Sequence, residues 1–247
     1  MNVWSVDKRV MGAKNDSLNP VHRLLWPLLV ASLLACAQTA QDADELLQKA
    51  QSTAESIKSW RAEVIQKTRI SAPGIDLKSE VATKFAAQSP LLLNRQNSGD
   101  DKTTIVCDGA HLFYSGDGHS FQRSDATVSP QCNFPLSSFY KSENLENTAA
   151  TAAIVGHDHV RLSDGDRPCV LVHAEWKLDK GSNIHTLCID PASALILRDV
   201  AEIKDEKSGT RAITTTLFIS FETNPTFPTD TFKFSIPPGA VEAHPPI

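Results

Sequence analysis

The stretch Cys169-Val-Leu-Val-His-Ala-Glu-Trp-Lys-Leu-Asp-Lys-Gly-Ser-Asn-Ile-His-Thr-Leu-Cys-Ile189 decides the fold. Two β-rich runs, residues 169–176 and 184–189, flank the turn-rich residues 178–183, and this order is typical of a β-hairpin. Folding about the turn brings Cys169 and Cys188 within the short Cα separation that a disulfide requires. The sequence therefore predicts an antiparallel hairpin closed by a Cys169–Cys188 bridge.

Further strands are expected on both sides of this hairpin. Apolar and polar residues alternate from Trp60 to Val64 and from Val81 to Phe85, and β-rich runs separated by turns continue to Arg123. After the hairpin the β-like pattern resumes and ends in a predicted strand over residues 232–236.

Helical patterns are few. An amphipathic helix is expected over residues 43–57, with one apolar face made of Leu46, Leu47, Ala50, Ala54 and Ile57. The pattern turns helical again over residues 136–140 and 145–155. Many sequential strands with few helices predict an α+β, mainly β fold: a single curved antiparallel sheet that forms an unclosed β-barrel with a helical lid.

The N-terminal residues have the pattern of an export signal. Lys8, Arg9, Lys14 and Arg23 precede the apolar run of residues 24–35, which ends at Cys36. Cleavage before Cys36 would leave a lipid-anchored protein, whereas cleavage after Ala37 would release a soluble one. The apolar run, about a dozen residues, is shorter than the roughly 18 that span a membrane, although a permanent anchor is the remaining alternative. Translation can start at Met1 or Met11.

We therefore expect a signal peptide with a basic leader over residues 1–37 and one domain over residues 38–247, located in the periplasm. The chain has a net charge of −5 and no basic stripe, which argues against nucleic acid as a partner. An even number of cysteines follows Cys36, and this favours disulfides in an exported protein. Four cysteines allow three pairings, and Cys107–Cys132 is assigned by elimination beside Cys169–Cys188.

Catalytic and metal-binding motifs are not found in the sequence. There is no nucleophile elbow, phosphate-binding loop or His-Glu-x-x-His pattern, and the acidic clusters lie beside Gly or Ser in expected turns. An enzyme would need His157 or His159 in a cleft. A zinc site of Cys169, His173, His185 and Cys188 is disfavoured, because His185 and Cys188 are three apart in a strand and point to opposite faces. We expect a binding protein without cofactor, metal or catalytic residues.

A curved sheet has one concave face, whose apolar side chains can enclose a ligand. The alternative is that the same side chains fill an ordinary core. The residues selected as cavity candidates are Trp60, Val64, Phe85, Leu91, Leu93, Tyr114, Phe121, Trp176 and Phe218.

Four segments together resemble the periplasmic lipoprotein-carrier superfamily, which includes LolA-like, LolB-like and RseB-related proteins. They are the opening helix at Glu45-Leu-Leu-Gln-Lys-Ala with Ile57-Lys-Ser-Trp-Arg-Ala-Glu-Val, the strand-turn-strand Val106-Cys-Asp-Gly-Ala-His-Leu-Phe-Tyr, the segment Cys188-Ile-Asp-Pro-Ala-Ser-Ala-Leu, and the closing Phe232-Lys-Phe-Ser-Ile-Pro-Pro-Gly. The resemblance implies an unclosed β-barrel of about eleven antiparallel strands with a helical lid and a hydrophobic cavity for acyl chains.

The sequence departs from the true carriers at one informative position. In those carriers an arginine that holds the lid precedes the proline corresponding to Pro90, whereas this chain has Ser89 there and Arg95 farther along. The expected function is therefore binding of lipid, or of the acyl chains of lipoproteins, by a divergent member of the group. The alternative is an envelope-stress sensor or scaffold that binds an envelope protein partner.

Overall fold

The computed structural model describes residues 42–99, 102–116, 118–139, 151–178 and 181–243. The chain divides into two compact units, Met1–Gln38 and Thr39–Ile247, and the described residues belong to the second unit. The predicted signal peptide, Cys36 and both candidate start sites lie outside the described residues. Within the described residues, no helix combines the length and apolar character that crossing a bilayer requires.

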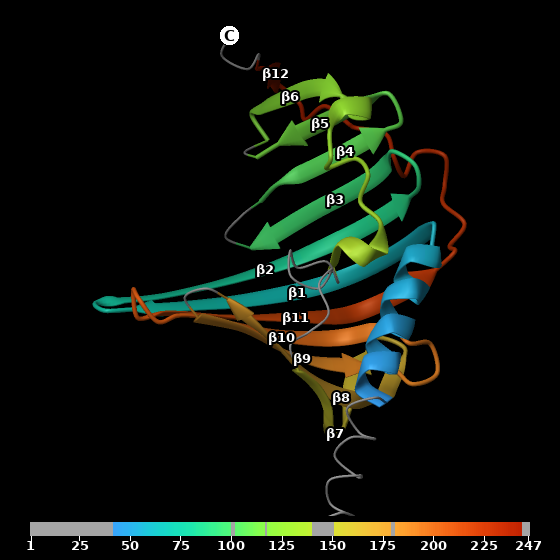
Figure 1. The fold of residues 1–247 in the computed structure, drawn as a ribbon. Coiled ribbons are helices and arrows are strands. Elements are labelled where there is room, and N and C mark those ends of the chain that lie inside the picture. The colour runs from blue at the N-terminus through green and yellow to red at the C-terminus, as the bar shows by residue number, and fades with distance from the viewer. Residues whose placement is uncertain (1–41, 100–101, 117, 140–150, 179–180, 244–247) are drawn as a thin grey trace, which may run out of the picture. The chain divides into compact units, whose positions relative to one another are not determined.

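Twelve strands of the second unit form one sheet (Figure 1). In sheet order they are β12 (Val241–Glu242), β6 (Ser120–Asp125), β5 (His111–Ser115), β4 (Thr104–Asp108), β3 (Leu92–Gly99), β2 (Ile75–Gln88), β1 (Ser59–Ala72), β11 (Thr210–Thr223), β10 (Ile196–Asp205), β9 (Gly181–Ile189), β8 (Gly165–Leu178) and β7 (Thr151–Leu162). Neighbouring strands pair antiparallel, except that β12 runs parallel to β6. The terminal strands β12 and β7 are not neighbours, so the sheet is an unclosed barrel, as the sequence predicts.

The pairing register assigns every strand residue to one of two faces. Side chains of residues directly paired across neighbouring strands share a face. Trp60 of β1 thus shares its face with Ala87 of β2, Leu93 of β3 and Cys107 of β4. We call the face that carries Trp60 the inner face and the opposite one the outer face.

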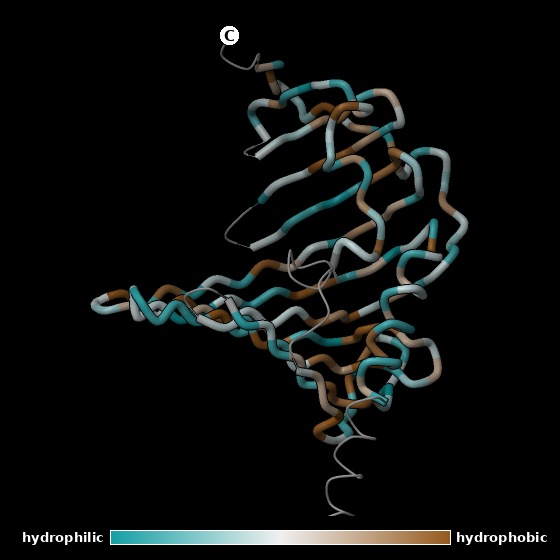
Figure 2. The backbone as a smooth tube through the Cα atoms, in the orientation of Figure 1, coloured by the Kyte–Doolittle hydropathy of each residue, from teal (hydrophilic) through white to brown (hydrophobic). Residues whose placement is uncertain are grey.

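One helix, over residues 42–56, packs on the inner face (Figure 1). Ala43, Ala50 and Ala54 are almost fully buried in the same core as Trp60. Leu46, Leu47 and Ile57 pack against that core, so the predicted apolar helix face is confirmed. Figure 2 shows apolar positions gathering where this helix meets the sheet.

The predicted hairpin from Cys169 to Ile189 is confirmed as β8 and β9. The two cysteines are bridged, with their Cα atoms 5.3 Å apart. Cys188 pairs directly with Leu171, so Cys169 is its diagonal neighbour. The second bridge, Cys107–Cys132, is also formed, with a Cα separation of 5.6 Å.

The β7–β8 end of the sheet curls back toward β10 and β11. Arg198 of β10 donates a hydrogen bond of 2.7 Å to Asp158 of β7, although two strands separate them in sheet order. The amide of Ser163 donates to the carbonyl of Ile219 at 2.7 Å. The hydrogen bond from Arg198 lowers the pKa of the Asp158 carboxyl below its usual value. This contact is therefore fully present above the usual aspartate pKa and is lost as pH falls through the depressed value.

Two elements differ from the sequence prediction. Residues 151–155, predicted as the end of a helix, form the start of β7 because Ala152 and Ile154 pair with Ala174 and Val172 of β8. The rest of that predicted helix, through residue 150, lies outside the described residues.

Residues 232–236, predicted as a strand, have no strand structure. They belong instead to a C-terminal segment that crosses the outer face. There the Phe234 ring stacks on Phe113 with centroids 4.9 Å apart, so side-chain packing rather than strand pairing holds the segment.

Removal of the hairpin bridge tests this architecture. In the double variant Cys169→Ala/Cys188→Ala we expect the free energy of unfolding to fall by about 3 kcal/mol, because the bridge closes a loop of moderate length. Urea unfolding under non-reducing conditions measures this difference. Reduced wild-type protein loses both bridges and should therefore be less stable than the oxidised variant, which keeps Cys107–Cys132. Equal stability of the variant and the oxidised wild type would contradict the role given to the bridge.

Candidate functional site

The inner face is apolar where the helix and the following lid segment cover it. Its buried side chains there come from strands on both sides of β1: Trp60, Ala62, Val64, Phe85, Ala87, Leu93, Ile105, Cys107, Leu112, Val172, Leu187 and Phe218. Direct pairing connects them, as Ala62 faces Phe85 and Val64 faces Phe218. The result is a continuous apolar floor.

A lid segment, residues 126–139, crosses this floor between β6 and β7. It contains two 3-10 helices, η1 (Ala126–Val128) and η2 (Leu136–Phe139). Between them the Phe134 ring stacks on Phe85, with centroids 5.8 Å apart and planes 5° apart. The centroid of the Phe134 ring also lies 6.3 Å from that of Trp60. The Trp60 and Phe85 centroids are 5.5 Å apart. These three rings form an aromatic cluster that joins lid and floor.

A covalent bond holds the lid close to the aromatic cluster. Cys132, two residues before Phe134, is bridged to Cys107 on the inner face of β4. Two residues after Phe134, Leu136 is fully buried. The lid is therefore fixed to the floor at several points within a few residues.

The gap beside Phe134 is small. The gap lined by Trp60, Leu91 and Phe134 measures about 10 Å³. A void of this size holds at most about one water molecule. At this gap an acyl chain would therefore reach the floor only if the lid or the helix moved outward.

The structure brings most of the predicted cavity residues to one face. Seven of the candidates lie on the inner face: Trp60, Val64, Phe85, Leu93, Tyr114, Trp176 and Phe218. Leu91 precedes β3 and lines the gap beside Phe134. Phe121 lies on the outer face instead, where its ring is 5.5 Å from Phe234.

Phe134 and Phe221, two aromatic residues that lie beside Trp60, are not among the predicted cavity residues. Phe134 lies in a segment without strand alternation, and Phe221 of β11 stacks on Trp60 at 6.5 Å. The position of Phe134 two residues after a cysteine expected to be bridged is the sequence signal that could have identified it.

The inner face becomes polar along the same strands toward the hairpin turns. Its side chains there include Gln66, Ser79, Thr68, Thr214, Thr216, Asp199 and His185. The hydroxyls of Thr68 and Thr214 are 3.2 Å apart across β1 and β11. The His185 Nδ1 atom lies 3.0 Å from each carboxylate oxygen of Asp199. We call this region the polar band.

The zinc alternative is not realised in this arrangement. Cys169 and Cys188 are bonded to each other and therefore supply no thiolate. His185 shares the inner face with Leu187, whereas Cys188 points to the outer face. Among the described residues, no group of three or more His, Cys, Asp or Glu side chains is arranged to hold a metal ion.

Arg95 places a cation beside the aromatic cluster on the inner face. Its guanidinium carbon lies 5.7 Å from the centroid of the Phe85 ring, and its Nε donates to Asn97 at 3.2 Å. Ser89, at the position where the carriers have arginine, donates its backbone amide to the carbonyl of Lys58 at 2.7 Å. The positive charge therefore lies on β3 itself rather than before it.

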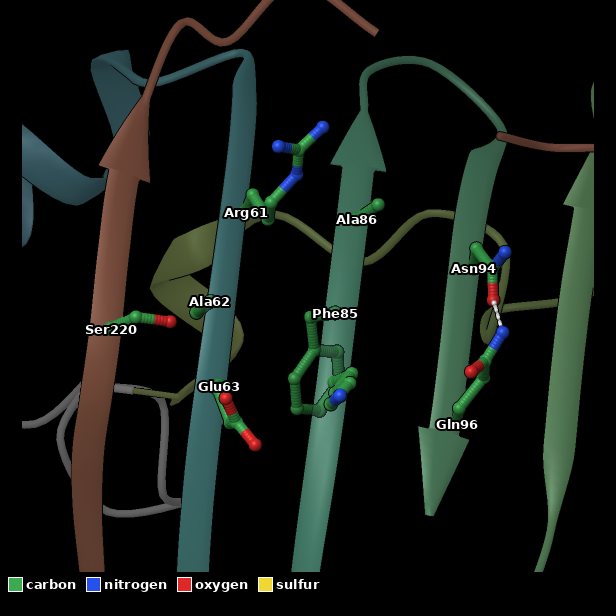
Figure 3. Close-up of a pocket in the computed structure, with 9 residues that line it drawn as sticks. Arg61, Ala62, Glu63, Phe85, Ala86, Asn94, Gln96 and Ser220 are labelled. Atoms are coloured by element: carbon green, nitrogen blue, oxygen red, sulfur yellow. Dashed lines mark hydrogen bonds between the residues drawn. The ribbon is translucent and has the colours of Figure 1, made fainter. Parts of the chain in front are cut away.

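A separate pocket lies on the outer face (Figure 3). It measures about 290 Å³, and its lining side chains include Arg61, Glu63, Lys84, Asn94, Gln96 and Ser220. Gln96 donates to Asn94 at 3.2 Å, and Glu63 pairs with Lys84 in the register. This pocket is polar and shallow, unlike the apolar floor on the other side of the same strands.

No protein-family model and no curated protein matches the chain. Solved structures do: MucB of Pseudomonas aeruginosa in its complex with MucA matches at 16% identity over 78% of this chain, with a TM-score of 0.39. A LolA-superfamily protein of Nitrosomonas europaea matches at 10% identity, covering 78% of this chain and 97% of its own length, with a TM-score of 0.34. The lipoprotein LppX of Mycobacterium tuberculosis matches at 13%, covering 76% and 98%, with a TM-score of 0.35.

The chain spans about 61% of the length of that MucB structure. At these identities and TM-scores the likeness says nothing about a ligand or a partner. The half-barrel itself is established by the register of the twelve-stranded sheet. The chain is thus similar to MucB, LolA-superfamily and LppX structures.

Proposed function

We propose that this is an exported envelope protein that binds an acyl chain, of a lipid or a lipoprotein, between the inner face and its helical lid. The observation that carries the proposal is the cover of the apolar floor. A closed barrel or a second sheet would fix such a floor permanently. Here the cover consists of one helix and a lid segment that is bridged to β4 at Cys132, and neither belongs to the sheet, so the helix can move away without breaking strand pairing.

The energetics of this cover support ligand exchange. The helix contacts the core through Ala43, Ala50 and Ala54, whose small side chains contribute little buried area each, and through the partly buried Leu46 and Leu47. Each methylene that replaces water on the floor contributes about 0.8 kcal/mol. A long acyl chain has enough methylenes to offset the loss of these alanine and leucine contacts together with the contact of Phe134.

Export is part of the proposal. Two disulfides fit an oxidising compartment, in agreement with the leader ahead of Cys36. Acylation of Cys36 would tether a lipid receptor to a membrane, whereas cleavage after Ala37 would release a shuttle. In either case we assign binding rather than catalysis.

A second candidate, binding of an envelope protein partner, is favoured by an apolar row on the inner face near the hairpin turns. Pairing connects the four residues of this row directly: Ile203, Ala212, Ile70 and Leu77. Leu77 is 60% exposed and Ile203 is 47% exposed. Exposed apolar clusters of this kind often mark interaction surfaces.

The contact of Phe134 with Phe85 predicts how a lid variant should bind a hydrophobic dye. Replacing Phe134 by alanine removes the ring that covers Phe85, so binding of the hydrophobic dye N-phenyl-1-naphthylamine should increase several-fold, measured by fluorescence titration. The matched control is Phe227→Ala, because Phe227 contacts Arg61 on the outer face. Equal dye binding by both variants would contradict a lid function for Phe134.

The bound ligand itself provides the main test. Native mass spectrometry of the protein purified from the bacterial envelope should show a mass increase that organic extraction releases as acyl lipid. The Phe221→Ala variant, altered beside Trp60, should carry less lipid, while Phe227→Ala should carry as much as the wild type.

Two outcomes would change the proposal. Protein that is free of lipid, and that takes up none from liposomes, would overturn acyl-chain binding. A co-purifying protein or peptide in place of lipid would favour the second candidate.

A further inference from the structure

The inner face contains two buried hydrogen-bond acceptors without a donor. Among the described residues, Nε2 of His185 and Oδ1 of Asn183 have no hydrogen-bond partner. His185 is 3% exposed and Asn183 is 2% exposed. An unsatisfied buried polar atom costs about 1–3 kcal/mol, so each atom favours any species that brings it a donor.

The tautomer of His185 follows from its neighbour. Nδ1 lies 3.0 Å from both oxygens of Asp199, so the ring donates its Nδ1 proton to that carboxylate. With its proton on Nδ1, the ring presents the lone pair of Nε2. His185 is therefore an acceptor on its unpartnered side.

The two free acceptors lie side by side on the inner face of β9. Asn183 and His185 are two residues apart in the strand, which places their Cα atoms about 6–7 Å apart on one face. Asn183 pairs with Trp176 of β8, and the Trp176 ring meets the His185 ring edge to face at 5.3 Å. Acceptors and an aromatic ring therefore converge on one small region.

The charge of this region is negative. The Asp199 carboxylate lies on the inner face of β10, beside His185. No lysine or arginine lies on the inner face in the described parts of β8 to β11. Arg95 is on β3, five strand spacings or about 24 Å along the sheet from β9.

The apolar floor leads directly to this region. On β9 Leu187 belongs to the floor, and the next inner-face residues are His185 and Asn183. An amphiphile whose chain lies on the floor can therefore place its head group at the polar band.

We propose that His185, Asn183 and Asp199 form the head-group site of the acyl ligand and that the head group is a primary ammonium; this rests on the proposed function. An ammonium has three N–H donors, two of which can meet Nε2 of His185 and Oδ1 of Asn183, while Asp199 binds the other ring nitrogen on the far side of the imidazole. Its charge compensates Asp199, and the Trp176 face favours a cation over a neutral group. A carboxylate or phosphate there would meet acceptors and a like charge.

Three probes of equal chain length test the head group at pH 7.5, below their micelle concentrations: dodecylammonium, dodecanol and dodecanoate. Calorimetric titration should show dodecylammonium binding about tenfold or more tightly than dodecanol, since charged hydrogen bonds contribute more than neutral ones. Dodecanoate should bind most weakly.

Variants locate the preference. Asp199→Asn should abolish the advantage of dodecylammonium while the affinity for dodecanol stays within about twofold, because the chain still lies on the floor. The control is Glu202→Gln, which removes a carboxylate from the outer face of the same strand and should keep the preference. Far-ultraviolet circular dichroism verifies folding of each variant.

The outcomes separate the two proposals. Equal binding of the three probes by the wild-type protein would overturn the ammonium site and leave acyl-chain binding intact. Binding of none of them would overturn the proposed function. If Asp199→Asn does not fold, the order of the three affinities in the wild type decides the head group alone.

Discussion

The contact of Phe134 with Phe85 and Trp60 is the interaction on which the rest of this structure depends. A single sheet that does not close leaves one apolar face without a partner layer, and exposing that face to water would be costly. The helix of residues 42–56 covers part of it through alanines and leucines, and the lid covers a further part through Phe134 and Leu136. The bridge of Cys132 to Cys107 keeps that ring in place. Stability and access to the apolar floor are therefore controlled by the same few residues.

The polarity of the inner face changes along its strands, and this change would orient a bound amphiphile. Apolar side chains predominate near Trp60, and hydroxyl, carboxylate and imidazole groups follow toward the hairpin turns. An amphiphile has the same order of chemistry from chain to head group. The curl of the sheet, held by Arg198 and Asp158, brings β7 toward β10 and β11. The inner face is thus apolar at one end and polar farther along its strands, rather than uniformly apolar.

Sequence patterns predicted the elements that depend on contacts between residues near one another in the chain. The hairpin around Cys169 and Cys188 and the apolar face of the first helix were both readable from spacing alone. Residues 151–155 form a short apolar run that suits a helix or a strand, and only pairing with β8 decides between them. Phe121 was misplaced because its face depends on the register of β5 and β6, and Phe134 was missed because its contacts with Phe85 and Trp60 are remote in sequence. The register between strands and the packing of the lid depend on contacts between residues far apart in the chain, so a single sequence does not predict them.

The most direct test of acyl-chain binding on the floor is fluorescence quenching of Trp60 by a dodecanol brominated at its terminal carbon. The protein would carry Trp4→Phe, Trp26→Phe and Trp176→Phe, so that Trp60 is its one indole. A chain that lies on the floor brings bromine into contact with Trp60, and emission should fall strongly with saturation at low probe concentration. Unbrominated dodecanol should cause no such loss. Saturable binding of the brominated probe without quenching of Trp60 would contradict the account, because the chain would then lie elsewhere on the molecule.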